Sequence, residues 1–208
     1  MKLVIVDLGI SNLGSICRAL SRLDHEICVV DNHRSLRESN GIMILPGVGS
    51  FGAAVEVLEN TGLRDSLTQM ASEGRGLLGI CLGMQLLLTC SEEAQGVPGL
   101  NLIEGIARKF DKRGGLKVPH MGFNSVEIAP PAFEEFSLYA GRDFYFVHSY
   151  YVDMVKPEEI FLYTSYGHRF ASGISRDNLI GVQFHPEKSQ DVGVNFLNQC
   201  IERLSVYA

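Results

Sequence analysis

The sequence lacks a basic excess, a paired-cysteine pattern and a long hydrophobic run, and each absence excludes a class of protein. Eighteen basic and 24 acidic residues give a net charge of −6, which argues against a general nucleic-acid surface. The five cysteines are an odd number without CxxC spacing, so neither a disulfide framework nor a zinc site is indicated. No apolar run approaches the ~18 residues of a transmembrane helix, and the first run is too short for a signal peptide. We therefore expect a cytoplasmic protein with reduced thiols.

The remaining composition is that of an ordinary globular protein. Hydrophobic residues make up 46% and charged residues 20% of the 208 residues, so disorder and a coiled coil are excluded as the main architecture. A chain of this length buries a sizeable core without a disulfide or a metal. No internal repeat or linker is evident, which predicts one domain over residues 1–208. The 22 glycines are the one excess.

Two patterns of secondary structure divide the chain. In the first half, short apolar runs alternate with segments of helical spacing, which predicts a parallel sheet covered on both faces. From about residue 100 the pattern changes to short β-rich pieces separated by Gly, Pro and Asp, which predicts an antiparallel second half. The predicted strands are 3–6, 27–30, 42–45, 77–80, 105–110, 124–128, 144–148, 160–164 and 179–184. One predicted helix begins after Ser11-Asn12, and another follows the strand at 77–80 and ends at 88. The other predicted helices are 51–58, 63–72 and 192–204.

The strongest local signal is Gly-Ile-Cys-Leu-Gly at residues 79–83, between a buried strand and a helix. It has the form of a nucleophile elbow with cysteine in place of serine. The flanking glycines permit a tight turn, and the start of the following helix favours a thiolate at Cys81. The alternative is a buried structural cysteine, which is the common state of a free thiol and fits Cys17, Cys28, Cys90 and Cys200.

A second signal, Phe-His-Pro-Glu at residues 184–187, follows the last predicted strand. Pro186 favours an extended conformation at His185, and in extended chain residues i and i+2 lie on the same side. Glu187 could therefore orient His185 as a general base. Alone, the motif favours an ordinary turn at a strand end, but together with Cys81 it favours catalysis, because a cysteine nucleophile with a distant histidine is a recognisable combination.

The third signal is Pro-Gly-Val-Gly-Ser-Phe at residues 46–51, after the third predicted strand. Two close glycines allow a backbone N–H to turn into a cavity, as an oxyanion hole requires. A phosphate-binding loop is a weaker alternative because the Gly-Lys-Ser/Thr ending is absent. A plain connection between strand and helix is the other alternative.

Together these motifs resemble those of the class I (triad-type) glutamine amidotransferases. The resemblance rests on Gly-Ile-Cys-Leu-Gly-Met-Gln at 79–85, Pro-Gly-Val-Gly at 46–49 and Gln-Phe-His-Pro-Glu-Lys-Ser at 183–189, and it extends over the whole chain. It implies one α/β domain of flavodoxin-like type, with a mixed central sheet and helices on both faces.

Further motifs resemble one branch of that family, the glutaminase subunits of imidazole glycerol phosphate synthases. They are Val-Asp-x-Gly-x-x-Asn-Leu at 6–13, Pro-His-Met-Gly at 119–122 and Tyr-Phe-Val-His-Ser-Tyr at 145–150. Phe123 stands where that branch commonly has tryptophan, which leaves open a paralogue that supplies ammonia to a different synthase.

The family reaction implied by the resemblance is hydrolysis of glutamine to glutamate and ammonia, without a metal or other cofactor. A cysteine would attack the side-chain amide, a histidine–glutamate pair would transfer the proton, and backbone N–H groups would hold the oxyanion. The residues so implied are Cys81, His185 and Glu187 for catalysis, and Leu82, Val48 and Gly49 for the oxyanion hole.

Four further residues are implied in binding glutamine. Gln85 would contact the amide region, Glu93 the α-ammonium group, and Ser149 and Tyr150 the substrate through main-chain groups. Without the resemblance, Glu93 and its neighbour could equally be a solvated helix end. The histidines at 120, 148 and 168 are interpreted as structural, loop or interface residues.

The resemblance also implies a partner, because ammonia is of no use to this subunit alone. The expected partner is a (βα)8-barrel cyclase subunit in a heterodimer. We also hypothesise that the partner's nucleotide ligand activates the glutaminase, since the paired glycines make rotation of the Val48 peptide easy. A cysteine hydrolase on the same fold and an inactive binding subunit are the alternatives.

Overall fold

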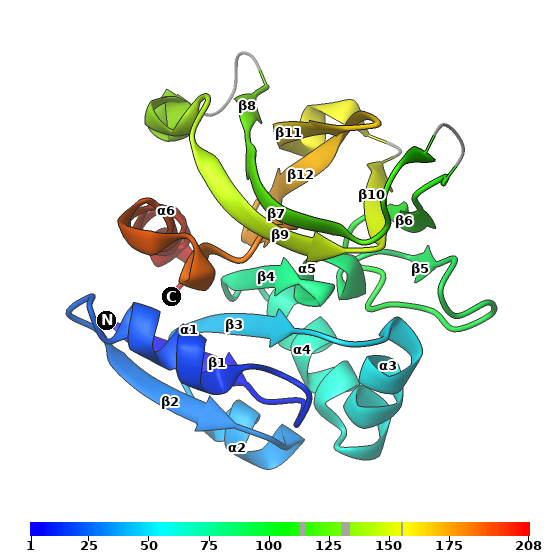
Figure 1. Ribbon diagram of the computed structural model, residues 1–208. Coiled ribbons are helices and arrows are strands. Elements are labelled where there is room, and N and C mark those ends of the chain that lie inside the picture. Colours follow the sequence, from blue (N-terminus) through cyan, green and yellow to red (C-terminus); the bar gives the residue numbers. More distant parts are fainter. Residues whose placement is uncertain (113–114, 130–133, 155) are drawn as a thin grey trace.

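The computed structural model describes residues 1–112, 115–129, 134–154 and 156–208 (Figure 1). Thirteen strands and six α-helices are defined within these ranges. The strands are β1 (Lys2–Val6), β2 (Glu26–Val30), β3 (Ile42–Gly47), β4 (Leu77–Cys81), β5 (Cys90–Ser91), β6 (Gly105–Lys109), β7 (His120–Ser125), β8 (Glu127–Ile128), β9 (Asp143–His148), β10 (Tyr150–Met154), β11 (Ile160–Tyr166), β12 (His168–Arg176) and β13 (Leu179–Val182). The helices are α1 (Leu13–Leu20), α2 (His33–Glu38), α3 (Phe51–Asn60), α4 (Leu63–Ser72), α5 (Leu82–Leu86) and α6 (Gln190–Leu204), with short 3-10 helices η2 (Glu134–Tyr139), η3 (Pro157–Glu159), η4 (Pro186–Lys188) and η5 (Ser205–Tyr207).

The first half of the chain forms the predicted parallel sheet, to which the second half adds one strand, β13. Strands β2, β1, β3, β4 and β13 lie side by side in that order, all parallel. Strands β3 and β4 are buried along their whole length, as expected for strands covered on both faces. No helix in the described ranges is long and apolar enough to span a bilayer.

Helices cover both faces of this sheet, which confirms the predicted fold class. Apolar residues of α1 and α6 pack against one face, and those of α2, α3, α4 and α5 pack against the other. Helix α1 begins where the sequence indicates, because the Asn12 side chain accepts a hydrogen bond from the Ser15 N–H at 3.3 Å and so caps the first turn.

The second half of the chain is mainly antiparallel, as predicted, but the prediction is wrong for β13, which pairs with β4 in parallel. Strands β5 and β6 also pair in parallel. Strand β12 pairs with β13, β11 and β10, and continues the sheet towards β6 and β5. Strands β7 and β9 form a separate two-stranded ribbon, which lies across the sheet in Figure 1. The ribbon is tied to the end of β13 by a bridge between Tyr145 and His185.

Several predicted boundaries are wrong, each for a local reason. The strand expected at 124–128 is two strands, since residues up to Ser125 pair with β9 whereas Glu127 and Ile128 pair with β11. Helix α5 ends at Leu86 because the next carbonyls bond the loop at 99–103, as in Leu102 N–H to Leu87 O at 2.9 Å. Strands β10 and β12 and helix α2 lie outside the predicted segments.

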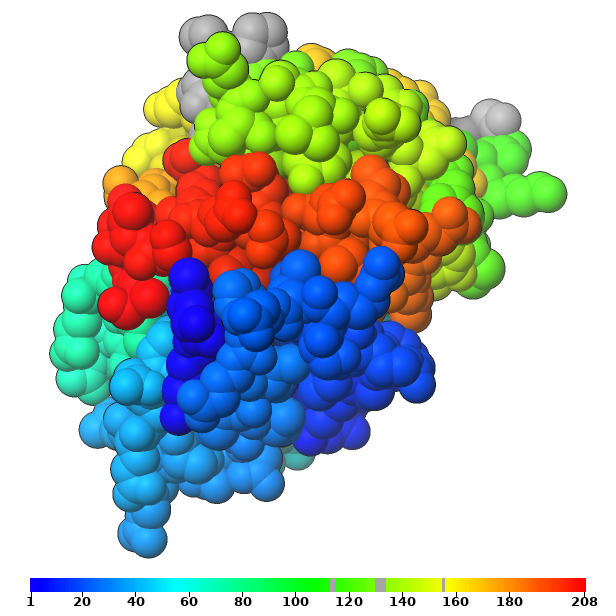
Figure 2. Space-filling view, turned by 90° about the vertical axis from the view of Figure 1, so that its left-hand side faces the viewer, coloured from blue at the N-terminus to red at the C-terminus, as the bar shows by residue number. Residues whose placement is uncertain are grey.

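Helix α6 joins the two halves of the molecule. In Figure 2 it forms a band between the N-terminal elements and the segment that contains η2. The fully buried Phe196 is the centre of this contact, with ring centroids 5.4 Å from Phe136, 5.2 Å from Phe144 and 5.1 Å from Phe184. Because Phe184 directly precedes His185, this aromatic cluster supports the segment that carries the histidine motif.

The Phe196→Ala variant tests this role of α6. We expect it to lower the free energy of unfolding by about 3–5 kcal/mol, since it removes a buried ring and leaves a cavity. Urea denaturation measures the change, with Val206→Ala as control, because Val206 is 79% exposed and its loss should cost less than about 0.5 kcal/mol. Equal stability of the two variants would contradict the assignment.

Candidate functional site

Cys81 lies at a sharp turn between β4 and α5. Its backbone has φ 55° and ψ −108°, a positive φ that an L-residue adopts only at a cost of about 1–3 kcal/mol. Helix α5 begins at the next residue, Leu82. The thiol-bearing residue is 5% exposed and lines a pocket. This is the backbone geometry that a nucleophile elbow requires.

The two glycines of the motif are required by close packing of backbone on backbone. A Cβ at Gly83 would lie 1.8 Å from the carbonyl oxygen of Leu45 on β3, and one at Gly79 would lie 2.7 Å from the Gly83 carbonyl oxygen. Helix α5 therefore sits directly on the ends of β3 and β4, and this contact holds Cys81 in its strained conformation.

The loop at residues 47–50 lies beside the elbow. A Cβ at Gly47 would approach the Leu82 Cβ to 3.0 Å, whereas Gly49 has φ +99° with open space around its Cα. Ser50 then caps α3 by accepting a hydrogen bond from the Ala53 N–H. Val48 and Gly49 consequently line the same pocket as Cys81.

His185 and Glu187 lie next to each other behind the elbow. His185 Nδ1 is 2.8 Å from Glu187 Oε1, and both side chains are buried. His185 is extended, with φ −101° and ψ 91°, as its position before Pro186 predicts. Glu187 is not extended, however: it belongs to the 3-10 helix η4, and this turn brings its carboxylate back to the imidazole.

The backbone of the histidine segment is fixed by two groups. The His185 N–H donates to the Tyr145 carbonyl at 2.8 Å. The Ser189 hydroxyl donates to the His185 carbonyl at 2.7 Å and accepts from the Tyr145 N–H at 2.9 Å. The imidazole therefore has a defined position relative to the ribbon.

The charges around His185 favour its protonated form. Burial opposes a charge on the ring, but the negative charges of Cys81 and Glu187 outweigh burial and raise the pKa of His185 well above its ordinary value. Nε2 is buried and makes no regular hydrogen bond within the described part of the chain, and Cys81 raises the pKa of the ring through its charge and through a side-chain contact of hydrogen-bond type. A thiolate–imidazolium pair is the state that this arrangement stabilises.

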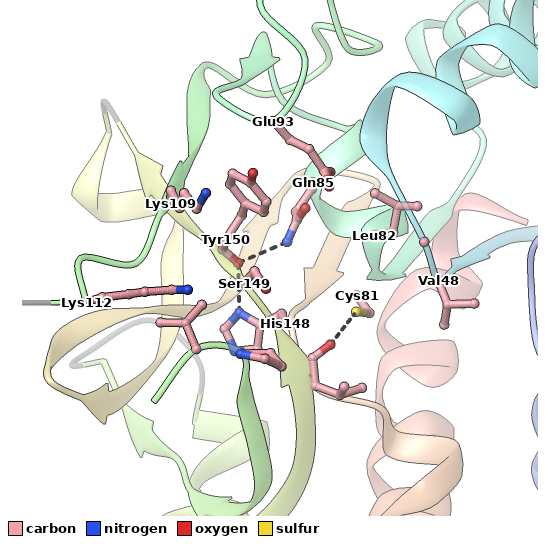
Figure 3. Close-up of a pocket in the computed structure, with 14 residues that line it drawn as sticks. Val48, Cys81, Leu82, Gln85, Glu93, Lys109, Lys112, His148, Ser149 and Tyr150 are labelled. Atoms are coloured by element: carbon pink, nitrogen blue, oxygen red, sulfur yellow. Dashed lines mark hydrogen bonds between the residues drawn. The ribbon is translucent and has the colours of Figure 1, made fainter. Parts of the chain in front are cut away.

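A pocket of about 500 Å³ opens in front of Cys81 (Figure 3). It contains every predicted oxyanion and substrate residue, whereas His185 and Glu187 are outside its lining. The lining residues are Val48, Gly49, Cys81, Leu82, Gln85, Glu93, Lys109, Lys112, Val118, Pro119, Val147, His148, Ser149 and Tyr150. Residues from both halves of the chain thus form one cavity.

Gln85 and Glu93 already have partners in the protein. Gln85 Nε2 donates to the Tyr150 carbonyl at 3.1 Å and to Gln183 Oε1 at 3.0 Å. Glu93 Oε2 accepts from the Phe51 N–H at 2.7 Å, at the start of α3. The neighbouring Glu92 does not line the pocket and pairs with Arg108 instead.

Several residues in or near the pocket were not predicted from the sequence. Gln183 Nε2 donates to Cys81 Sγ at 3.7 Å, and Cys81 Sγ lies 4.0 Å from the Val147 carbonyl oxygen. Strand alternation could have indicated Gln183, which stands two residues before His185. Lys109 and Lys112 also border the pocket, and no pattern in the sequence marks them.

The family model for class-I glutamine amidotransferases matches residues 4–203 of the sequence. The chain belongs to this family.

Similar amidotransferases cover nearly the whole chain. A relative from Moorella thermoacetica is 44% identical, with 94% of this chain and 91% of the relative aligned. One from Methanopyrus kandleri is 45% identical over 97% and 98%, and one from Bacillus subtilis is 42% identical over 94% and 93%. All three are named imidazole glycerol phosphate synthase subunit HisH.

Solved structures share the amidotransferase fold. A crystal structure described as a glutamine amidotransferase superposes with a TM-score of 0.73 at 19% identity, covering 97% of this chain and 98% of that one. A chain of PurLQS from Thermotoga maritima gives 0.73 at 17% identity, covering 99% and 98%. At these identities the likeness bears on the fold alone.

The Glu187→Gln variant tests the electrostatic account of this amidotransferase site. Removing the negative charge stabilises the imidazolium less, so the pKa of His185 should fall and the ring should lose its proton at lower pH than in the native chain. NMR titration of the His185 imidazole measures the shift. Glu26→Gln, on the edge strand β2, is the control and should leave the titration unchanged. An unchanged pKa in Glu187→Gln would contradict the account.

Proposed function

We propose that the chain is the glutaminase subunit of an imidazole glycerol phosphate synthase, in histidine biosynthesis. The observation that carries the proposal is a strained cysteine that lines a pocket, with a buried histidine–glutamate pair beside it. The similarity to synthase subunits over nearly their full length supports the choice of this branch of the family. The location that we infer is the cytoplasm.

The proposed reaction begins with attack by Cys81. Its sulfur bonds to the side-chain amide carbon of glutamine, and the thiol proton resides on His185. The tetrahedral oxyanion accepts hydrogen bonds from the backbone N–H of Leu82 and from the Val48–Gly49 segment; one such donor is worth about 3 kcal/mol of the barrier. Collapse breaks the carbon–nitrogen bond, and His185 gives its proton to the leaving ammonia.

Water then hydrolyses the glutamyl thioester. His185 accepts a proton from the attacking water, and release of glutamate restores the Cys81–His185 pair. Glu187 stabilises the imidazolium in both halves of the cycle and holds the ring through Nδ1. No step in this scheme calls for a metal or another cofactor.

The pocket offers complementary groups for an α-amino acid. We assign the Glu93 carboxylate to the α-ammonium group, and main-chain groups of Ser149 and Tyr150 to the rest of the glutamine head. Gln85 lies between these groups and the elbow, next to the position of the side-chain amide. The cavity of about 500 Å³ is large enough for one amino acid.

A (βα)8-barrel cyclase subunit is the partner that we propose, in a heterodimer. With the ammonia, it would convert a ribulosyl-formimino carboxamide nucleotide into imidazole glycerol phosphate and aminoimidazole carboxamide ribotide. Met121 and Phe123 on β7, the strand that directly follows the pocket residues Val118 and Pro119, support a docking face, since they are 62% and 53% exposed although large and apolar.

Cys81→Ser tests the proposed function directly. With the cyclase partner present, synthesis from glutamine should fall by at least about a thousandfold, whereas synthesis from added ammonium salts should be retained, because only the source of ammonia is lost. Assays of product with each nitrogen source measure the two activities. Cys17→Ser is the matched control, since Cys17 is a half-buried thiol on α1. Loss of the ammonium-dependent reaction as well would mean that Cys81 is structural.

A second test concerns control by the partner. Gly49 has open space around it and a positive φ, so the peptide before it can turn without a clash. We expect slow glutamine hydrolysis by the chain alone and a rise of about a hundredfold with the partner and its nucleotide, the effect of completing an oxyanion hole. Glutamate release is measured for the chain alone, with the empty partner and with the loaded partner. Equal rates in all three conditions would refute the switch.

A further inference from the structure

Two buried histidines of the ribbon face each other beside the pocket. His120 on β7 and His148 on β9 are directly opposite in the strand register and are 3% and 5% exposed. His120 Nδ1 lies 2.9 Å from His148 Nε2. Neither residue has a role in the proposed reaction, although His148 borders the pocket.

Both ends of this pair are fixed by groups whose hydrogen-bonding roles are known. At one end, His148 Nδ1 lies 2.7 Å from the Tyr150 carbonyl, which can only accept. At the other end, Asn124 Nδ2 lies 3.2 Å from His120 Nε2. The orientation of the Asn124 amide is itself determined, since Nδ2 also donates to the Ser165 carbonyl and Oδ1 accepts from the Ser125 N–H.

Only one arrangement of protons satisfies all of these contacts. The Tyr150 carbonyl requires a proton on His148 Nδ1, and the Asn124 amide requires a bare Nε2 on His120. The contact between the rings then requires a proton on His120 Nδ1 and a bare Nε2 on His148. Both histidines are therefore neutral Nδ1–H tautomers, and all hydrogen bonds run in one direction from Asn124 to Tyr150.

The surroundings also favour neutral rings. His120 stacks between Phe146 and Tyr166, with ring centroids 4.8 Å and 4.0 Å away, and Phe170 packs against both histidines. Burial lowers the pKa of His120 to about 4 and is also the largest influence on His148, whose pKa falls to about 3. Neither ring carries a charge near neutral pH.

The chain of hydrogen bonds ends at a carbonyl that belongs to the pocket wall. The Tyr150 oxygen accepts from His148 and from Gln85, and residues 147–150 line the cavity. Figure 3 shows His148 and Gln85 approaching this oxygen from two different directions. Loss of the His148 donor would leave Gln85 as the remaining side-chain donor to the Tyr150 carbonyl.

We propose that His120 and His148 are positioning residues for the substrate: as a one-way hydrogen-bonded pair they fix the Tyr150 carbonyl, and with it the wall that receives the head of glutamine. The identity of the substrate rests on the proposed function, whereas the arrangement of the pair does not. Interactions made equally with bound substrate and transition state alter KM more than kcat, so the pair should act mainly on KM.

Kinetics of three variants test the proposal in the complex with the partner. His148→Phe keeps an aromatic ring but removes the donor, and should raise KM for glutamine roughly tenfold while kcat changes less than about threefold. His148→Asn restores an N–H close to the Nδ1 position and should recover most of the loss. Phe170→Leu is the packing control; it should lower the melting temperature without raising KM.

The outcomes are distinct. A native KM in His148→Phe, or an equal rise in Phe170→Leu, would overturn the positioning role. If the native complex hydrolyses no glutamine, the proposed function fails instead. A second measurement covers that case and the case of a variant that does not fold: ¹⁵N NMR of the histidine rings in the native chain. Protons on Nδ1 alone in both rings between about pH 5 and about pH 8 support the pair, and a proton on either Nε2 would overturn it.

Discussion

The whole site depends on one close contact, in which α5 lies directly on the backbone of β3 and β4. Side chains at Gly79 and Gly83 would collide with main-chain atoms, so the contact exists only because both positions lack a Cβ. It forces the chain to reverse at Cys81 with a positive φ. The energy of that strained residue is offset by the burial of the apolar residues of β4 and α5. Close packing thus holds the Cys81 thiol in a fixed position at the end of the sheet.

The charges next to Cys81 are the second determinant of the site. Cys81 lines the pocket, and beside it lies the His185 imidazole, whose pKa is raised by the neighbouring negative charges. Two other buried histidines, on the ribbon that the His185 segment contacts at Tyr145, have their pKa lowered instead. The difference lies in the partners: a carboxylate and a thiol surround His185, while aromatic rings and neutral dipoles surround His120 and His148. Histidine therefore supplies both a charged group, at His185, and a rigid neutral hydrogen-bonded pair, at His120 and His148, within the same domain.

Much of the fold and of the candidate site could be predicted from the sequence, wherever local signals and burial agree. Helix α4 has the predicted bounds, and strand β4 extends only one residue beyond its predicted end. Both could be predicted because an uninterrupted apolar run indicates a buried strand and a regular apolar spacing indicates a helix. Helix α2 has six residues with Leu36 alone buried, too few for a periodicity. Strand β12 contains Ser172 and Gly173, which resemble a turn, yet Ser172 is satisfied by Thr164 and Gly173 admits Phe161 and Leu162. Lys109 and Lys112 join the pocket through tertiary contacts, which no local pattern in the sequence indicates.

The pocket forms only when distant parts of the chain have folded together. Its walls come from the loop after β3, the turn after β4 and the junction of β9 with β10, so residues about a hundred positions apart must meet before any cavity exists. Contacts of such long range form late in folding, because closing the intervening chain is entropically costly. A partly folded molecule, even one with its parallel strands already assembled, has no enclosed cavity. An N-terminal fragment released by proteolysis or by interrupted synthesis therefore lacks half of the pocket wall and has no means of liberating ammonia in an uncontrolled way.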